Sequence, residues 1–148
     1  MSRRPYPQLE LDRQLCFPLY AASRAVVRAY GSLLDAVGLT YPQYLTMIAL
    51  WDADAPMTVG ELGRQLRLDS GTLTPLLKRL EAVGYVTRRR DVEDERRVLL
   101  EVTDAGWALR DDVAHVPAEL FKSTELTKED AADLRRLLND LLEQLDGQ

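Results

Sequence analysis

The sequence predicts a mainly α-helical protein with a small β wing, arranged as a winged helix-turn-helix between N-terminal and C-terminal helices. Three observations predict this class. Two short helical segments, 58–66 and 70–82, are separated by a three-residue turn, which is the spacing of a helix-turn-helix. Two β-prone segments follow directly, and helices with apolar stripes lie toward both ends of the chain.

Length and composition favour one domain. The chain has 148 residues, of which 46% are hydrophobic, and this is enough for a single core. No stretch reaches the ~18 uninterrupted apolar residues of a membrane span, and residues 1–8 are polar and turn-rich, unlike a signal peptide. We therefore expect a cytoplasmic protein with no membrane partner, whose lone cysteine, Cys16, is a free thiol.

Two helices are expected before the helix-turn-helix. The first covers about 9–34, where apolar residues recur near the 3.6-residue period, and Pro18 either bends it or marks its true start. Gly38 ends this segment. Thr40 then has the position of an N-cap for a second apolar helix, and residues 52–56 form a connector.

The helix-turn-helix carries strong capping signals. Thr58 and Glu61 form a capping box, in which each side chain accepts a hydrogen bond from the other residue's backbone N–H. Asp69 or Ser70 caps the next helix, which Gly84 ends. One face of that helix is apolar and consists of Leu73, Leu76, Leu77, Leu80 and Val83.

A hairpin is predicted after Gly84. Residues 85–88 and 98–102 are β-prone, and the charged residues 89–97 between them form the tip. A hairpin that directly follows a helix-turn-helix is a wing.

The C-terminal third is predicted to be helical again. Thr103 opens a helix to about His115, Pro117 interrupts or kinks it, and Thr127 caps a last helix. That last helix bears a broad leucine stripe made of Leu134, Leu137, Leu138, Leu141, Leu142 and Leu145. Because such a stripe needs an apolar partner, we expect a second subunit to cover it.

The charge is distributed unevenly along the chain. The net charge is −5, but residues 64–97 carry nine basic and six acidic side chains, a net charge of +3. Residues 98–148 carry five basic and twelve acidic side chains, a net charge of −7. The basic segment therefore coincides with the predicted helix-turn-helix and wing, which favours a nucleic-acid partner.

The candidate DNA-binding residues form two groups. Small side chains at the start of a recognition helix let backbone N–H groups approach phosphates, and cations follow. The helix group is Ser70, Gly71, Thr72, Thr74, Lys78 and Arg79, and the wing group is Arg88, Arg90, Asp94, Arg96 and Arg97. Arg96 is expected to enter a minor groove, held by Asp94. The alternatives are an amphipathic helix with a solvated polar face and a charged, solvent-exposed turn.

Three motifs resemble a known family. Residues 94–103, DERRVLLEVT, resemble the wing signature of the MarR family of bacterial regulators. Residues 68–81, LDSGTLTPLLKRLE, resemble the recognition helix of its organic-hydroperoxide-resistance branch, and residues 15–20, LCFPLY, resemble the sensor segment of that branch. The likeness runs in order from about residue 11 to 115.

The resemblance implies a homodimeric transcriptional repressor, with neither enzymatic activity nor a cofactor, whose two wings straddle double-stranded DNA. It implies an inverted-repeat operator and release when an organic hydroperoxide oxidises Cys16, with Tyr30 and Tyr41 holding the sulfur from the other subunit. The implied organisation is one MarR-type domain, 1–148, with dimerisation helices at about 9–38 and 116–148 and a DNA-binding lobe at about 40–103 whose wing is 86–102.

One feature departs from part of the family. Some members carry a second, resolving cysteine, and this chain has none. The sulfenic acid of Cys16 is then capped by a small cellular thiol, cyclises with a backbone nitrogen or is oxidised further. An apolar hydroperoxide would suit the apolar side chains near Cys16, which are Leu15, Phe17, Leu19 and, provided that it lines the site, Trp51.

Other interpretations stay open on the sequence alone. A lone cysteine on an apolar helix is usually a small hydrophobic side chain. The chain is then a MarR-type regulator that binds an aromatic or drug-like ligand at the dimer crevice, with Cys16 inert. Further alternatives are a thiol peroxidase and a helical protein-interaction module. His115 has no ligand cluster around it, so no metal site is expected.

Overall fold

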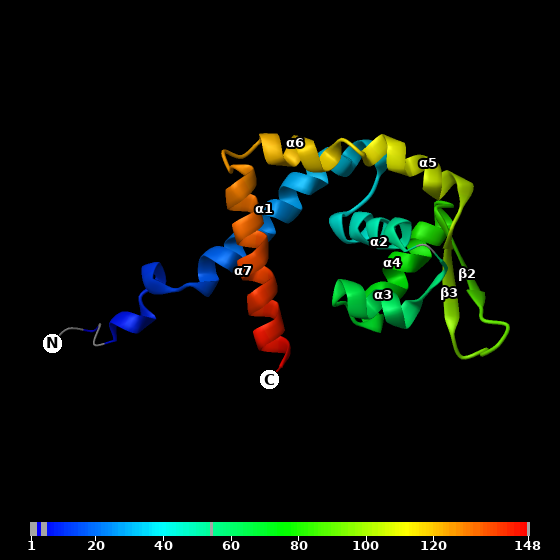
Figure 1. Cartoon of the computed structure of the whole chain (residues 1–148), viewed down its shortest axis with the longest axis horizontal. Coiled ribbons are helices and arrows are strands. Elements are labelled where there is room, and N and C mark those ends of the chain that lie inside the picture. Colours follow the sequence, from blue (N-terminus) through cyan, green and yellow to red (C-terminus); the bar gives the residue numbers. More distant parts are fainter. Residues whose placement is uncertain (1–2, 4–5, 54, 148) are drawn as a thin grey trace. The chain divides into compact units, whose positions relative to one another are not determined.

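The computed structural model describes residues 3, 6–53 and 55–147. The described residues form seven α-helices and three strands: α1 (Cys16–Leu34), α2 (Tyr41–Asp52), β1 (Met57–Thr58), α3 (Val59–Leu66), α4 (Ser70–Ala82), β2 (Val86–Arg90), β3 (Val98–Val102), α5 (Asp104–Val113), α6 (Val116–Lys122) and α7 (Lys128–Asp146) (Figure 1). The predicted winged helix-turn-helix class is confirmed. Parts of the polar start, 1–8, and of the connector, 52–56, lie outside the described residues.

The chain divides into two compact units, Met1–Ala114 and His115–Gln148. The first unit contains the helix-turn-helix, the wing and α1, and the second contains α6 and α7. The single domain over 1–148 therefore remains a prediction.

The first long helix begins later than the periodicity predicts. Two 3-10 turns, 7–9 and 11–13, precede α1, and the Gln14 side chain donates hydrogen bonds to the carbonyls of Gln8 and Glu10 at 2.8 and 2.9 Å. Pro18 is the third residue of α1, where a missing N–H costs no helical hydrogen bond. A helical start at residue 9 was wrong, and the alternative that Pro18 marks the true start is confirmed.

Side-chain caps fix the helix-turn-helix as predicted. The N–H of Glu61 donates to Thr58 Oγ1 at 3.1 Å, and the N–H of Thr58 donates to Glu61 Oε2 at 3.2 Å. Asp69 is the N-cap of α4, and its Oδ1 accepts from the N–H of Thr72 at 2.8 Å. Between these caps Arg67 has a φ of 57°, a left-handed conformation that turns the chain from α3 into α4.

The sheet is larger than the hairpin that the sequence predicts. Its strand order is β1-β3-β2, and both pairings are antiparallel. The β2–β3 register runs from Val86 opposite Val102 to Arg90 opposite Val98, so the tip is 91–97 and not 89–97. Strand β1 was missed because two residues show no alternation, yet it joins the helix-turn-helix to the wing by pairing with β3.

The core of the first unit lies between the helix-turn-helix and the sheet. Figure 1 shows α2, α3 and α4 beside the β2–β3 hairpin. Its most deeply buried apolar side chains are Leu34, Met47, Leu62, Leu73, Leu77, Leu80, Val86 and Leu100. The hydroxyl of Thr103 donates to the carbonyl of Gly84 at 2.5 Å, and Trp51 Nε1 donates to the carbonyl of Gly106 at 3.1 Å. The first contact joins the N-cap of α5 to the turn after α4, and the second joins α2 to α5.

In the second unit α7 begins as predicted. Thr127 and Asp130 form a capping box, with hydrogen bonds of 3.0 and 3.2 Å. Pro117 lies in the first turn of α6, so it separates two helices and does not kink one. Four leucines of the α7 stripe are exposed in the single chain: Leu134, Leu137, Leu142 and Leu145. No helix among the described residues is long and apolar enough to cross a membrane.

Candidate functional site

Helix α4 exposes all six residues that the sequence predicts to contact DNA. Lys78 and Arg79 carry positive charges without an acidic partner in the described part of the chain. Hydrogen bonds from the backbone N–H and then the side chain of Thr72 hold the pKa of the Asp69 carboxyl below its usual range. The surface of α4 therefore begins with a charged cap and ends with two free cations.

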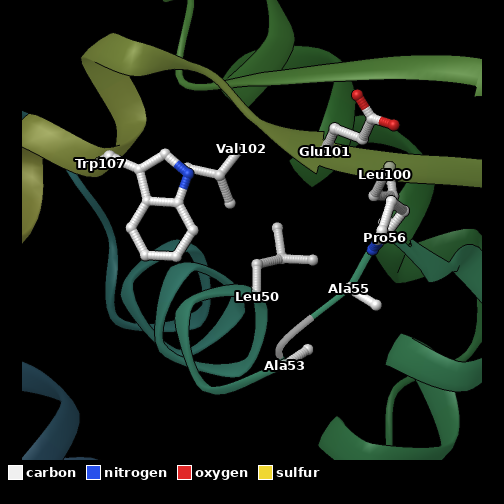
Figure 2. Close-up of a pocket in the computed structure, with 8 residues that line it drawn as sticks. All are labelled: Leu50, Ala53, Ala55, Pro56, Leu100, Glu101, Val102 and Trp107. Atoms are coloured by element: carbon white, nitrogen blue, oxygen red, sulfur yellow. The ribbon is translucent and has the colours of Figure 1, made fainter.

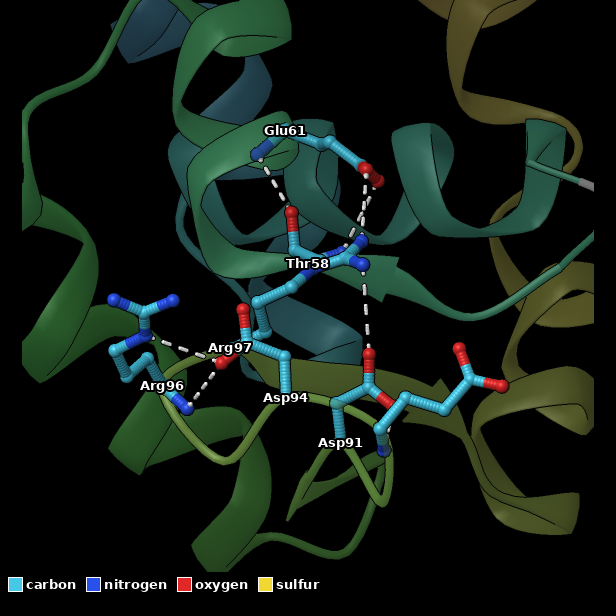
Figure 3. Close-up of polar contacts among 7 residues, drawn as sticks. Thr58, Glu61, Asp91, Asp94, Arg96 and Arg97 are labelled. Carbon is cyan, nitrogen blue, oxygen red and sulfur yellow. Dashed lines mark hydrogen bonds and ion pairs between the residues drawn. The ribbon is translucent and has the colours of Figure 1, made fainter.

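The wing holds one arginine out toward solvent. Arg96 Nε lies 3.2 Å from Asp94 Oδ1, and the backbone N–H of Arg96 donates to the same oxygen at 3.1 Å (Figure 3). The side chain of Arg96 is 92% exposed. The structure thus brings together Asp94 and Arg96, the pair expected from the sequence.

Arg97, the next residue, has a side chain that is 49% exposed and that reaches toward α3. Its guanidinium lies 3.6 Å from Glu61 Oε1 on α3 and 3.5 Å from Asp91 Oδ2 on the wing (Figure 3). Sequence reasoning missed Glu61 and Asp91 as partners of Arg97. Glu61 and Arg97 are 36 positions apart in the sequence, and only the folded wing reveals their proximity.

The remaining wing arginines are also engaged within the protein. Arg88 Nε lies 2.8 Å from Glu81 Oε2, which connects β2 to the end of α4. Arg89 donates to Glu101 across the hairpin at 2.7 and 2.9 Å. The side chain of Arg90 donates to the backbone carbonyl of Glu95 at 2.8 Å. Of the predicted wing cations, Arg96 is therefore the most available to a ligand.

Cys16 is the first residue of α1 and is exposed. Its neighbours in sequence are apolar and exposed in the single chain, with Leu15 83% exposed and Phe17 45% exposed. The N-terminal end of a helix favours a negative charge, because its first N–H groups have no helical acceptor. Cys16 therefore lies at an exposed helix N-terminus between apolar neighbours in sequence.

Three tyrosines form a cluster between α1 and α2. The rings of Tyr30 and Tyr41 stack with centroids 4.4 Å apart, and Tyr44 lies 5.7 and 6.2 Å from them. Burial raises the pKa of all three phenols above the usual value, and the neighbouring rings add to this for Tyr41 and Tyr44. No local pattern in the sequence indicates that Tyr44 belongs to this cluster.

Cys16 and the tyrosines do not meet within one chain. Tyr30 follows Cys16 by fourteen residues on the same helix, a separation of about 21 Å at 1.5 Å per residue. Tyr41 stacks on Tyr30 and is similarly remote. Trp51 donates a hydrogen bond to Gly106 of α5, and no hydrogen bond joins it to Cys16 among the described residues.

A cavity of about 250 Å³ lies elsewhere in the first unit (Figure 2). Its walls come from the end of α2, the segment before β1, strand β3 and the start of α5, and they consist of Leu50, Ala53, Ala55, Pro56, Leu100, Glu101, Val102 and Trp107. Trp51 is not part of this lining. No cluster of three or more potential metal-ligating side chains occurs among residues 3, 6–53 and 55–147.

Comparison with known proteins identifies the family. The family described as transcriptional regulator SarA/Rot matches residues 28–113. The organic hydroperoxide resistance transcriptional regulator of Bacillus subtilis is 44% identical over 140 residues, which cover 95% of each chain. Solved structures of AbfR, a Staphylococcus epidermidis protein, in reduced and in overoxidised form bound to DNA have TM-scores of 0.76 and 0.77. Both cover 93% of this chain and 96% of AbfR, at 36% and 35% identity.

These matches agree with the geometry. The matched segment spans the last third of α1, α2, the helix-turn-helix, the wing and α5. The Bacillus subtilis relative extends the likeness along nearly the whole chain, so it also includes the segment around Cys16. The chain therefore belongs to the SarA/Rot family of transcriptional regulators, within the MarR-type winged-helix proteins that its motifs resemble.

Proposed function

We propose that this protein is a homodimeric repressor that binds an inverted-repeat operator and is released when an organic hydroperoxide oxidises Cys16. The observation that carries the proposal is the position of Cys16 at the exposed, apolar start of α1. The name of the Bacillus subtilis relative, an organic hydroperoxide resistance transcriptional regulator, supports the same signal.

The proposed DNA contacts come from α4 and the wing. Helix α4 enters the major groove with its small N-terminal side chains and with Lys78 and Arg79, and Arg96 enters the adjacent minor groove. Structures of AbfR with DNA support this arrangement, as does the net charge of +3 on residues 64–97. Because these contacts are mostly electrostatic, affinity falls steeply as salt rises.

A second copy of the chain is proposed to complete the thiol site. The exposed leucines of α7 and the exposed Phe17, Val26 and Val27 of α1 are apolar surface without a partner in the described single chain. Large exposed apolar faces of this kind mark interfaces between proteins. In the dimer, the Tyr30 and Tyr41 hydroxyls of one subunit donate hydrogen bonds to the Cys16 sulfur of the other.

The proposed chemistry is an oxidation of the thiolate. The Cys16 sulfur attacks one peroxide oxygen, the O–O bond breaks, and the displaced alkoxide takes a proton and leaves as an alcohol. The sulfur becomes a sulfenic acid, which a small thiol converts to a mixed disulfide with loss of water. No second cysteine exists to close an internal disulfide.

Loss of the tyrosine hydrogen bonds changes the free energy enough to shift a protein from one conformational state to another. A hydrogen bond to a charged acceptor contributes about 1.5–3 kcal/mol, so two bonds at each of two sites contribute roughly 6–12 kcal/mol. Moving the ratio of two conformational states from 1:99 to 99:1 requires about 5.5 kcal/mol. We propose the mixed disulfide as the releasing state, because an overoxidised sulfinate is still an anionic acceptor for the tyrosines. The existence of overoxidised AbfR bound to DNA supports this distinction.

The test is a gel shift on the promoter upstream of the protein's own gene, with organic hydroperoxide and hydrogen peroxide compared in the presence of a small thiol. Release at a much lower dose of the organic hydroperoxide is expected. Mass spectrometry of Cys16 on the released protein distinguishes the mixed disulfide from the sulfinate. Release without any change in the mass of Cys16 would contradict the proposal.

A second candidate keeps the fold and changes the signal. The cavity beside Trp107 suits a flat aromatic ligand, because Trp107 is 43% exposed and the other lining residues apart from Glu101 are aliphatic. A regulator of this kind responds to the ligand with Cys16 replaced by serine, whereas a thiol sensor does not respond to hydroperoxide after that change.

A further inference from the structure

We infer that Arg97 is a positioning residue, which with Glu61 and Asp91 ties the wing to the helix-turn-helix so that Arg96 and α4 reach the DNA together. This inference rests on the proposed DNA binding. It assigns to Arg97 a different task from the direct DNA contact that its sequence position suggests. The three residues are called the wing bridge below.

Every carboxylate oxygen of the wing bridge has its own contact. Glu61 Oε2 accepts from the N–H of Thr58 at 3.2 Å, and Glu61 Oε1 lies 3.6 Å from Arg97. Asp91 Oδ1 accepts from the N–H of Glu93 at 3.1 Å, and Asp91 Oδ2 lies 3.5 Å from Arg97. One guanidinium therefore connects the capping box of α3 to the turn that shapes the wing tip.

The backbone of the wing tip supports the same geometry. The N–H of Asp91 donates to the carbonyl of Arg97, and the N–H of Arg97 donates to the carbonyl of Asp94, each at 2.9 Å. The Asp91 side chain is only 15% exposed. Arg97 is thus held through both its main chain and its side chain, whereas the neighbouring Arg96 is held by Asp94 alone and projects into solvent.

The charges also argue against a phosphate contact by Arg97. One guanidinium and two carboxylates give the wing bridge a net charge of −1, so a phosphate meets no net attraction there. Solvent-exposed ion pairs change the free energy only modestly, and networks of charges contribute more than isolated ion pairs do. We expect a loss of roughly 2–5-fold for each wing when the wing bridge is broken, or about 4–25-fold for a dimer with two wings.

Three variants and a control test this role. Glu61→Gln removes the ion pair but keeps the capping box, because glutamine caps as well as glutamate does. Arg97→Gln removes the cation, and the double variant removes both. The control is Glu93→Gln, which removes one negative charge from the wing tip, where Glu93 has no ion pair among the described residues. Operator affinity is measured by fluorescence anisotropy between 50 and 200 mM salt.

The two roles of Arg97 predict opposite results. For a positioning residue, Glu61→Gln and Arg97→Gln weaken binding to similar extents, the double variant is no weaker than either, and the salt slope stays that of the wild type. For a phosphate contact, Arg97→Gln lowers the salt slope by about one per wing and Glu61→Gln tightens binding, as Glu93→Gln does. The second pattern would overturn the inference.

A measurement on the DNA-free protein separates this inference from the proposed function. Hydrogen exchange at the amides of Asp91 and Arg97 should accelerate in Glu61→Gln and Arg97→Gln, and should stay unchanged in Glu93→Gln. If the wild type fails to bind the operator, the proposed function fails, and these exchange rates still decide whether the wing bridge holds the wing. Wild-type exchange rates in both Glu61→Gln and Arg97→Gln would refute the wing bridge.

Discussion

The phenol rings of Tyr30 and Tyr41 stack face to face, with centroids 4.4 Å apart and an angle of 26° between their planes. Tyr30 belongs to α1 and Tyr41 is the first residue of α2, so this pair joins two helices. Burial raises the pKa of both phenols, which keeps both hydroxyls protonated at neutral pH. Two adjacent hydrogen-bond donors of this kind suit an anionic sulfur delivered by a second subunit.

Removing one of these hydroxyls should slow the reaction of Cys16. Tyr30→Phe and Tyr41→Phe keep the stacked rings but lose a donor, and such a bond to a charged acceptor is worth about 1.5–3 kcal/mol. We expect the rate constant with cumene hydroperoxide to fall roughly 10-fold or more, measured by stopped-flow fluorescence. Tyr44→Phe is the matched control, because Tyr44 is 3% exposed and out of reach of a partner. Rate constants equal to that of the wild type in Tyr30→Phe and Tyr41→Phe would exclude a role for the two hydroxyls.

The tyrosine cluster should also make the fold sensitive to alkali. The folded pKa values of Tyr30, Tyr41 and Tyr44 are raised, so the unfolded chain loses these protons first as the pH rises through about 10. Stability is therefore fully present below pH 10 and declines above it. Thermal melting between pH 9 and 11.5 measures this, and Tyr44→Phe should show a shallower decline than the wild type. Identical curves would contradict the effect of burial.

Arg96 should contribute to DNA affinity by direct contact. Its side chain is 92% exposed and steadied by Asp94. Arg96→Gln should weaken operator binding, and the slope of log affinity against log salt should fall by about one per wing. Fluorescence anisotropy over a salt series gives both values. A wild-type slope in this variant would assign the contact to another cation.

The close approach of α5 to Tyr85 and to the end of β3 should make Gly106 intolerant of a side chain. A Cβ at this position would lie 2.2 Å from the carbonyl oxygen of Tyr85 and 2.7 Å from Val102 Cγ1. Gly106→Ala should destabilise the protein by about 1–3 kcal/mol or more, measured by urea denaturation. Gly60→Ala is the control, since only ordinary contacts of 3.6 and 4.0 Å surround its Cβ on exposed α3, and we expect a gain of about 0.5–1 kcal/mol. A similar loss in both variants would show that crowding at Gly106 is not the cause.

The sequence predicted the elements whose signals are local. The caps at Thr58, Asp69 and Thr127 lie within three residues of their partners, so the spacing alone locates the starts of α3, α4 and α7. The start of α1 was placed seven residues too early, because apolar periodicity continues through two 3-10 turns and only Pro18 marks the change. Strand β1 is too short to produce a pattern of its own.

Contacts between distant segments could not be predicted in the same way. Arg97 and Arg88 belong to a basic run typical of a DNA-binding wing, and nothing local indicates that Glu61 and Glu81 face them. Tyr44 joins the tyrosine cluster through the packing of α1 on α2. Sequence periodicity also cannot test the proposed pairing of Cys16 with Tyr30, because the two residues are about 21 Å apart along one helix.

The most direct test of the thiol sensor is operator release by cumene hydroperoxide in the wild type and in Cys16→Ser, measured by gel shift with a small thiol present. Both proteins should bind the untreated operator, since Cys16 lies outside α4 and the wing. Hydroperoxide should release the wild type and leave Cys16→Ser bound. Release of Cys16→Ser at the same dose would contradict it.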